Sequence, residues 1–369
     1  MKKIPFNIFN SFYLNNKDKI KTISEKILSS GKYIRDENTE ILEKNLSVIC
    51  QRKHAVTTAS CTDALFFAMK AAGIQRGDEV IIPTFSYIAS LTPILMCDAI
   101  PVFADIDVNS LMLDISKVKN LINKKTKAIV FVQLFGSCRN LDQLKSLAKE
   151  NDLILIEDAA QALGSTNNGK PSASFGDLSC ISFDPTKIVS AFGTGGAVLT
   201  DNETYYQTLL KLIHHGKNNT TNDFEILGYN SKIPEFNAAL INLQLDILEN
   251  TVKQITQKAN RYYENLKDIN KVKCFFPEKN STSTYHKFVI IAEDRDELRK
   301  SLSLKGIETR IHYDHLLHEQ KLLKDFQFIK HDLSVAKSIK SKVMSLPIYP
   351  ELGINEIDYI CDCIICFYK

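Results

Sequence analysis

Two short stretches of this chain decide its fold. Residues 153–161 read LILIEDAAQ, and residues 182–187 read SFDPTK. An apolar run that ends in polar residues predicts a strand buried on both faces, as in a parallel sheet. The first stretch therefore places the Asp158 carboxylate at the end of a buried strand. The second places the Ser182 hydroxyl and the Lys187 amine at the end of another.

A carboxylate and a lysine presented in this way fit pyridoxal phosphate. The lysine amine forms an imine with the aldehyde of that cofactor, and the carboxylate keeps the ring nitrogen protonated, so that the ring becomes an electron sink. We predict that Lys187 and Asp158 have these two roles. An unpaired buried aspartate costs several kcal/mol, and a pyridinium would be its partner. The alternative role for Asp158 is the N-cap of a following helix, and Gln161 lies one turn further, within reach of the cofactor's phenolic oxygen.

Three further positions are candidates for holding the same cofactor. Residues 60–63 read SCTD and open a helical pattern, so free N–H groups and the Thr62 hydroxyl could bind its phosphate. The alternative there is a plain N-cap. Tyr87 follows a strand pattern and could lie on the pyridine ring, or it could be an ordinary packed aromatic. Ser182 precedes Lys187 by a short turn, so its hydroxyl could reach the phosphate.

Strand and helix patterns alternate from about residue 60 to residue 200. Continuous apolar strands separated by helices predict an α/β fold with a mostly parallel central sheet and helices on both faces. A smaller α+β part follows, which predicts a large domain with an N-terminal arm over 1–245 and a small C-terminal domain over 246–369. The expected strands are 79–83, 101–104, 128–133, 153–157, 179–183, 196–200, 287–291 and 308–312. The expected helices are 62–73, 140–149, 202–214, 234–258 and 295–305.

Composition excludes several classes of protein. The chain has 369 residues, of which 44% are hydrophobic and 24% charged, with a net charge of +3 and no long run of one sign, so we expect no nucleic-acid partner. Nine scattered cysteines favour reduced thiols in the cytoplasm. No apolar run has membrane-spanning length, and the first residues do not resemble a signal peptide. A zinc site would need a second group of ligands in addition to Cys361, Cys363 and Cys366, and the spacing offers none. We therefore expect no metal.

An ordered set of motifs resembles the sugar-nucleotide aminotransferases of the DegT/StrS type, which are pyridoxal-phosphate enzymes of the aspartate-aminotransferase fold. The match covers nearly the whole chain. It comprises SCTDAL at 60–65, GDEVI at 77–81, PVFADID at 101–107, EDAAQ at 157–161, SFDPTK at 182–187, GYN at 228–230, IETRIHY at 307–313 and SLPIY at 345–349.

The resemblance implies a role for each matching position. Asn230 resembles an asparagine that reaches the phosphate across a subunit interface, so a homodimer with shared active sites is implied. His312 and Tyr313 lie where the small lobe approaches substrate. The remaining implied roles are Lys187 for the imine, Asp158 for the ring nitrogen, Gln161 for the ring hydroxyl, Tyr87 for stacking, and Thr62 and Ser182, with Cys61 between Ser60 and Thr62, for the phosphate.

Three residues depart from the pattern of that family. Cys61 stands where glycine is usual, and Lys232 stands where arginine is common. Asp184 occupies a position that is often aromatic or histidine, beside the lysine, and could contribute to substrate preference. Some relatives carry histidine in place of the lysine and perform dehydration. The presence of Lys187 favours transamination.

The implied activity is transfer of an amino group from an amino acid, expected to be L-glutamate, to the keto-sugar of a nucleoside-diphosphate sugar. A 3- or 4-keto-6-deoxyhexose, made for a surface polysaccharide such as O-antigen, is the expected acceptor, and pyridoxamine phosphate is the alternate cofactor form. The alternatives are a pyridoxal-phosphate sugar dehydratase or epimerase, and a non-catalytic regulator that binds the cofactor. The sequence leaves open the sugar, its nucleotide, the aminated carbon and the residues that bind the diphosphate.

Overall fold

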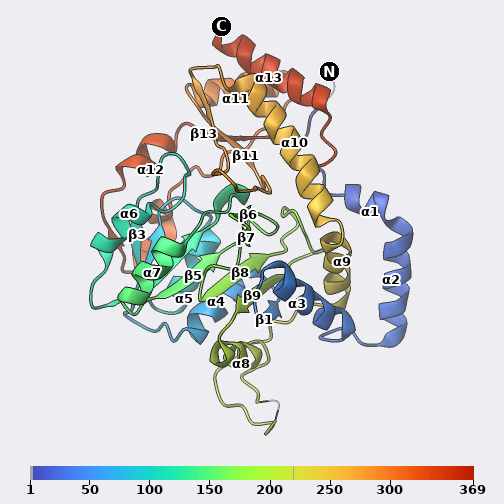
Figure 1. The fold of residues 1–369 in the computed structure, drawn as a ribbon, viewed down its shortest axis with the longest axis vertical. Helices are drawn as coiled ribbons and strands as arrows, with labels where there is room; N and C mark the ends of the chain where they lie inside the picture. Colours follow the sequence, from blue (N-terminus) through green and yellow to red (C-terminus); the bar gives the residue numbers. More distant parts are fainter. Residues whose placement is uncertain (1–2, 219) are drawn as a thin grey trace.

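An eight-stranded sheet forms the centre of the molecule (Figure 1). The computed structural model describes residues 3–218 and 220–369. Within them, β9 alone runs antiparallel to its neighbours in this sheet, and every other adjacent pair is parallel. In spatial order the strands are β1 (His54–Thr58), β9 (Gly196–Thr200), β8 (Leu178–Ser182), β5 (Ile154–Asp158), β4 (Thr126–Val132), β2 (Glu79–Pro83), β3 (Ile100–Ala104) and β12 (Ile329–Lys330).

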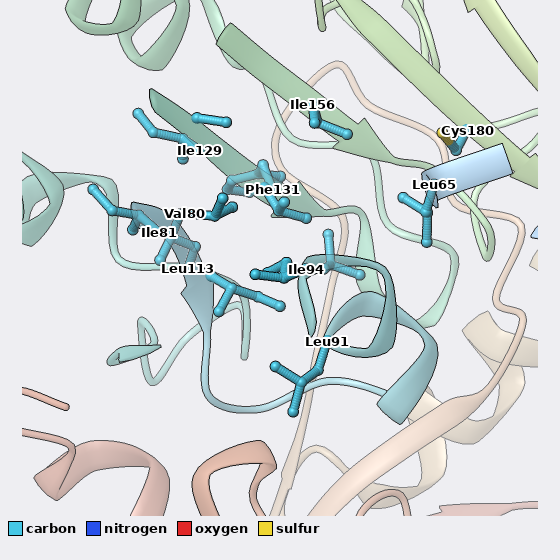
Figure 2. Close-up of a cluster of buried hydrophobic side chains, with 14 of the residues drawn as sticks. Leu65, Val80, Ile81, Leu91, Ile94, Leu113, Ile129, Phe131, Ile156 and Cys180 are labelled. Carbon is cyan, nitrogen blue, oxygen red and sulfur yellow. The ribbon is translucent and has the colours of Figure 1, made fainter. Parts of the chain in front are cut away.

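Helices cover both faces of this sheet, which confirms the predicted α/β fold. Neighbouring residues of a strand point to opposite faces, so Val56 packs on the side of α4 while Ala55 packs on the side of α3 and α9. Figure 2 shows part of the larger core, where side chains of β2, β4 and β5 meet Leu91 and Ile94. The helices are α1 (Ser11–Asn15), α2 (Lys17–Ser30), α3 (Glu37–Ile49), α4 (Cys61–Ala71), α5 (Thr92–Met96), α6 (Ile115–Val118), α7 (Asp142–Glu150), α8 (Glu203–Leu212), α9 (Glu235–Leu245), α10 (Leu248–Leu266), α11 (Arg295–Leu304), α12 (Ser334–Ile339) and α13 (Ile354–Tyr368).

A second, three-stranded sheet lies beside α10, α11 and α13 (Figure 1). Its strands are β10 (Val272–Cys274), β11 (Phe288–Ala292) and β13 (Val343–Leu346), and they share a hydrophobic cluster with these helices. Ile4 belongs to this cluster and pairs with Ile307, so the start of the chain packs against its C-terminal part. The division at residues 245 and 246 stays a prediction. A two-stranded hairpin, β6 (Thr166–Asn167) and β7 (Lys170–Pro171), completes the strands.

Two local expectations were wrong. The strand expected at 308–312 is absent, because Ile307 and Arg310 form only isolated bridges, one to Ile4 and one to Ser345. The single helix expected at 234–258 is two helices, α9 and α10, which turn at Asp246 and Ile247. No proline or glycine marks this turn. Tertiary packing produces it, since α9 is buried against the large sheet while α10 packs on α13.

Candidate active site

A cavity of about 800 Å³ opens where several strands of the large sheet end. The last residues of β4, β5 and β8 and the segments that follow β1, β2, β5 and β8 contribute to its lining, as expected for the carboxyl ends of parallel strands. Ten of the eleven predicted site residues line this cavity. They are Cys61, Thr62, Tyr87, Asp158, Gln161, Ser182, Asp184, Lys187, His312 and Tyr313.

Asp158 ends β5 and is buried in the cavity wall. Ser90 donates a hydrogen bond of 2.7 Å to its Oδ2, and the N–H of Ala160 donates one of 3.2 Å to its Oδ1. Ser86 lies 2.9 Å from Ser90, Oγ to Oγ, and extends this network. Burial raises the pKa of Asp158, and these donors oppose that shift. A cation in the cavity would therefore stabilise the ionised carboxylate strongly.

Lys187 follows β8 through a tight turn. Its N–H donates to the carbonyl oxygen of Asp184 at 2.9 Å, while the Asp184 carboxylate accepts from the N–H and hydroxyl of Thr186. Burial lowers the pKa of Lys187, and the nearby carboxylates of Asp158 and Asp184 oppose this. Among the described residues, no hydrogen-bond or ion-pair partner of its Nζ is found. The amine is thus unpaired and belongs to a half-buried side chain in the cavity wall.

The start of α4 supplies a site for an anion. Ser60 caps this helix by accepting from the N–H of Asp63 at 3.1 Å, which leaves the N–H groups of Cys61 and Thr62 without intrahelical partners. Ser182 lines the same part of the cavity. A Cβ at Gly196 would lie 2.6 Å from the nitrogen of Cys61, so this glycine lets α4 begin directly against β9. Cys61 itself is buried, and burial raises the pKa of its thiol.

Aromatic side chains form another wall. Gln161 donates to the hydroxyl of Tyr313 at 3.1 Å and accepts from the N–H of Phe135 at 2.8 Å, so its amide already has partners. Tyr313 lies against Tyr87, whose ring is 6.1 Å away and 55% exposed. His312 lies 2.8 Å from Ser345, Nδ1 to Oγ, and burial lowers the pKa of its ring to about 3.

Sequence reasoning missed a group of residues that lie beside the small sheet, just before β11 and in the segment bridged to β13. His286, Lys287 and Arg310 line the cavity, and so does Phe6 from the start of the chain. Burial lowers the pKa of Lys287 to about 7. Ser86 and Ser90 were also missed, because no local pattern tells a buried serine that supports a carboxylate from one that does not. The spacing of the two serines, one helical turn apart after a strand, was the only available signal.

Asn230 lies outside this cavity. It is exposed and pairs with His214 through an isolated bridge. Ser231 beside it donates to Asp63 at 2.7 Å and accepts from the N–H of Ala59 at 3.0 Å, which ties this loop to the start of α4. Residues 220–228 project from the body of the molecule, near the bottom of Figure 1. Asn230 therefore does not line this cavity.

The arrangement fits pyridoxal phosphate. An unpaired amine, a buried carboxylate that needs a cation, and free N–H groups at a helix start surround one cavity. These match the aldehyde, the ring nitrogen and the phosphate of the cofactor, respectively. The part of the chain that the structure describes contains no group of three His, Cys, Asp or Glu side chains arranged to hold a metal ion, and none of its helices is long and apolar enough to cross a membrane.

Comparisons with known proteins agree with this geometry. The model of the DegT/DnrJ/EryC1/StrS aminotransferase family matches residues 15–365. The UDP-2-acetamido-2-deoxy-3-oxo-D-glucuronate aminotransferase of Pseudomonas aeruginosa is 32% identical and covers 94% of this chain and 95% of its own. A pleiotropic regulatory protein of Geobacillus stearothermophilus is 30% identical and covers 99% of both. The crystal structure of NtdA from Bacillus subtilis with bound cofactor PMP has a TM-score of 0.91 and 26% identity, over 99% of this chain and 85% of that one.

Proposed function

Because this chain belongs to the DegT/DnrJ/EryC1/StrS aminotransferase family and its cofactor is pyridoxal phosphate, we propose that it transfers an amino group to the keto-sugar of a nucleoside-diphosphate sugar. The observation that carries this proposal is the placement of Lys187 and Asp158 on one cavity, close enough for their charges to interact. Lysine at position 187 favours transamination over the dehydration expected of a histidine there.

The residues of the chain have distinct roles in this reaction. When bound, the cofactor supplies an electron sink for the carbon that loses or gains a proton. Asp158, supported by Ser90, holds the positive charge of the ring nitrogen. Lys187 anchors the cofactor, and its Nζ then takes and returns the proton at the substrate carbon. Burial lowers the pKa of this amine, which raises the fraction that is neutral and able to act as the base. Thr62, Ser182 and the start of α4 bind the phosphate.

The amino donor proposed is L-glutamate. Wild-type protein incubated with glutamate and no sugar should release 2-oxoglutarate in an amount stoichiometric with its cofactor, while the absorbance of the bound cofactor changes. The Lys187→Ala variant should give neither. If no common amino acid produced either signal with wild-type protein, the dehydratase or the regulator would be the better hypothesis. The regulator is worth testing because one relative bears that name.

The proposed acceptor is a keto-sugar attached to a nucleoside diphosphate. The Pseudomonas relative acts, by its name, on a UDP-linked 3-oxo sugar, which supports testing 3-keto before 4-keto compounds. Protein that has reacted with glutamate should aminate one of these compounds, and product mass and NMR would identify the aminated carbon. Release of water without nitrogen transfer would support the dehydratase. We place the activity in the cytoplasm, as a step that supplies amino sugars for a surface polysaccharide.

A homodimer with shared sites accounts for the position of Asn230. In this arrangement Asn230 of one subunit serves the phosphate of the other. Lys187→Ala and Asn230→Ala proteins would then each be impaired, but their mixed dimer would contain one intact site. Unfolded and refolded together in equal amounts, they should recover about a quarter of wild-type activity, because half of the dimers are mixed and each has one good site. No recovery in a mixture shown to contain mixed dimers would refute the shared site.

A further inference from the structure

Lys287 is a buried lysine whose charge has no partner. It immediately precedes β11, and only 8% of its surface is exposed. Its Nζ has no hydrogen bond or ion pair to any residue that the structure describes, and lies 5.4 Å from the centre of the Phe6 ring. A buried ammonium is normally paired, since desolvation is expensive. An unpaired one on a cavity wall therefore indicates that its partner is a ligand.

Arg310 is a second cation near the same aromatic ring. Its guanidinium lies 5.8 Å from the centre of Phe6, and its only hydrogen bond to a residue that the structure describes goes to the main-chain oxygen of Thr309, at 3.4 Å. The nearby carboxylate of Glu308 is already occupied by Lys3, at 2.8 Å, and by the N–H of Phe6, at 3.2 Å. Two cationic side chains, the buried Lys287 and the exposed Arg310, thus lie near Phe6, and neither forms an ion pair with any residue that the structure describes, although Asp184 and Glu308 contribute negative charge nearby.

Lys287 and Lys187 line the same cavity, so a ligand of Lys287 lies within reach of the reacting carbon. The charges of Lys187 and Asp184 act on Lys287, and the rings of His286 and His312, which burial keeps neutral, line the same cavity. The cofactor phosphate has its own site at the start of α4. An anion next to the Lys187 amine must belong to the carbon that reacts there or to a near neighbour. In an amino acid that anion is a carboxylate, whereas the diphosphate of a nucleotide sugar with a 3- or 4-keto group is separated from the reacting carbon by the ring.

We propose that Lys287 and Arg310 form a carboxylate subsite, which holds a carboxylate of the substrate beside Lys187. This inference rests on the proposed function and names the chemistry that the site selects. The carboxylate has two possible sources, the amino donor or a uronic-acid carbon of the sugar. Lysine and arginine both bind carboxylates through charge-assisted hydrogen bonds, and Phe6 holds the two cations in place between substrates.

Binding of unreactive probes to the holoenzyme tests the subsite directly. Calorimetric titrations would use glutarate, a donor analogue without an amine, and UDP-glucuronate, a nucleotide sugar with a carboxylate but no ketone. Glutaramide, in which both carboxylates of glutarate are amides, and UDP-glucose are the matched probes that lack a carboxylate. Lys287→Met should weaken binding of at least one carboxylate probe by roughly tenfold to a hundredfold and leave its matched probe unchanged. Arg310→Met should act in the same direction, and Lys300→Met, which changes an exposed lysine of α11, should have no effect.

The pattern of losses identifies the source. If only glutarate binds more weakly, the subsite holds the carboxylate of the amino donor. If only UDP-glucuronate binds more weakly, the subsite holds the carboxylate of the sugar. If both bind more weakly, the subsite holds the donor in one half-reaction and the sugar in the other. Equal affinity of wild-type and Lys287→Met proteins for both probes would overturn the subsite. That result is separate from failure of the proposed function, which would appear as no release of 2-oxoglutarate from glutamate by wild-type protein. Circular dichroism of each variant would show that it is folded.

Discussion

Replacing Lys287 by methionine should make the protein more stable. Methionine keeps the apolar stem that packs in the cavity wall and removes the amine that burial disfavours. The direction of this change in stability follows from the lowered pKa of Lys287. Below about pH 7 the amine is charged in both folded and unfolded chains, and the folded state bears the full desolvation penalty. Between pH 7 and 10.5 the folded chain holds fewer protons than the unfolded chain, so this penalty falls as the pH rises.

The magnitude follows from the same values. The pKa of Lys287 falls from 10.5 in the unfolded chain to about 7 in the folded chain, and this difference sets an upper limit on the stability gained by Lys287→Met. The limit is roughly 5 kcal/mol at pH 6 and roughly 2 kcal/mol at pH 9. A chain of 369 residues has an unfolding entropy of about 0.8 kcal/mol per kelvin. The methionine variant should therefore melt up to about 6 °C above wild type at pH 6, and up to about 3 °C above it at pH 9.

Thermal melts of cofactor-free wild type, Lys287→Met and Lys300→Met would measure this difference. The comparison between pH 6 and pH 9 isolates Lys287, because the other titrating groups are common to all three proteins. A gain that is the same at both pH values, or no larger than that of the exposed control, would refute the argument. The gain in stability should accompany the loss of carboxylate binding, as expected for a residue kept for function.

Further predictions concern the carboxylate and the start of α4. Asp158→Asn should slow the glutamate half-reaction by at least about a hundredfold, because the ring nitrogen loses its counter-charge; an unchanged rate in stopped-flow absorbance would contradict this. Ser90→Ala should weaken cofactor binding by roughly tenfold to a hundredfold in a fluorescence titration, while Ser338→Ala, on exposed α12, should not. Gly196→Ala should lower the free energy of unfolding by about 1–3 kcal/mol in urea, because its Cβ would meet the main chain of Ser60 and Cys61; wild-type stability would contradict the close approach.

Much of the fold was predictable because the strands are continuous apolar runs. β2 and β9 begin and end where the sequence pattern placed them, and the other central strands differ by at most two residues at either end. The two outer strands were missed for physical reasons. β1 (HAVTT) mixes polar and apolar residues at an edge, and β12 has only two residues. Their existence depends on pairing with distant neighbours, which local sequence does not encode.

The candidate site was predictable where chemistry and local pattern coincide. A carboxylate at the end of an apolar strand and a lysine after a second strand mark Asp158 and Lys187. Nothing in the local sequence marks Lys287 as buried, and Phe6, whose ring centre lies 5.4 Å from its amine, comes from the far end of the chain. The support that Ser90 gives Asp158 likewise joins residues 68 positions apart. Such long-range contacts need the folded structure.

The central claim is that Lys187 holds the cofactor in a cavity that Asp158 also lines. Borohydride reduction of the purified protein, followed by digestion and peptide mass spectrometry, tests it most directly. We predict that the reduced cofactor is found on the peptide that contains Lys187, and that Lys187→Ala protein carries none. A cofactor fixed to Lys287 or to any other lysine would contradict the account.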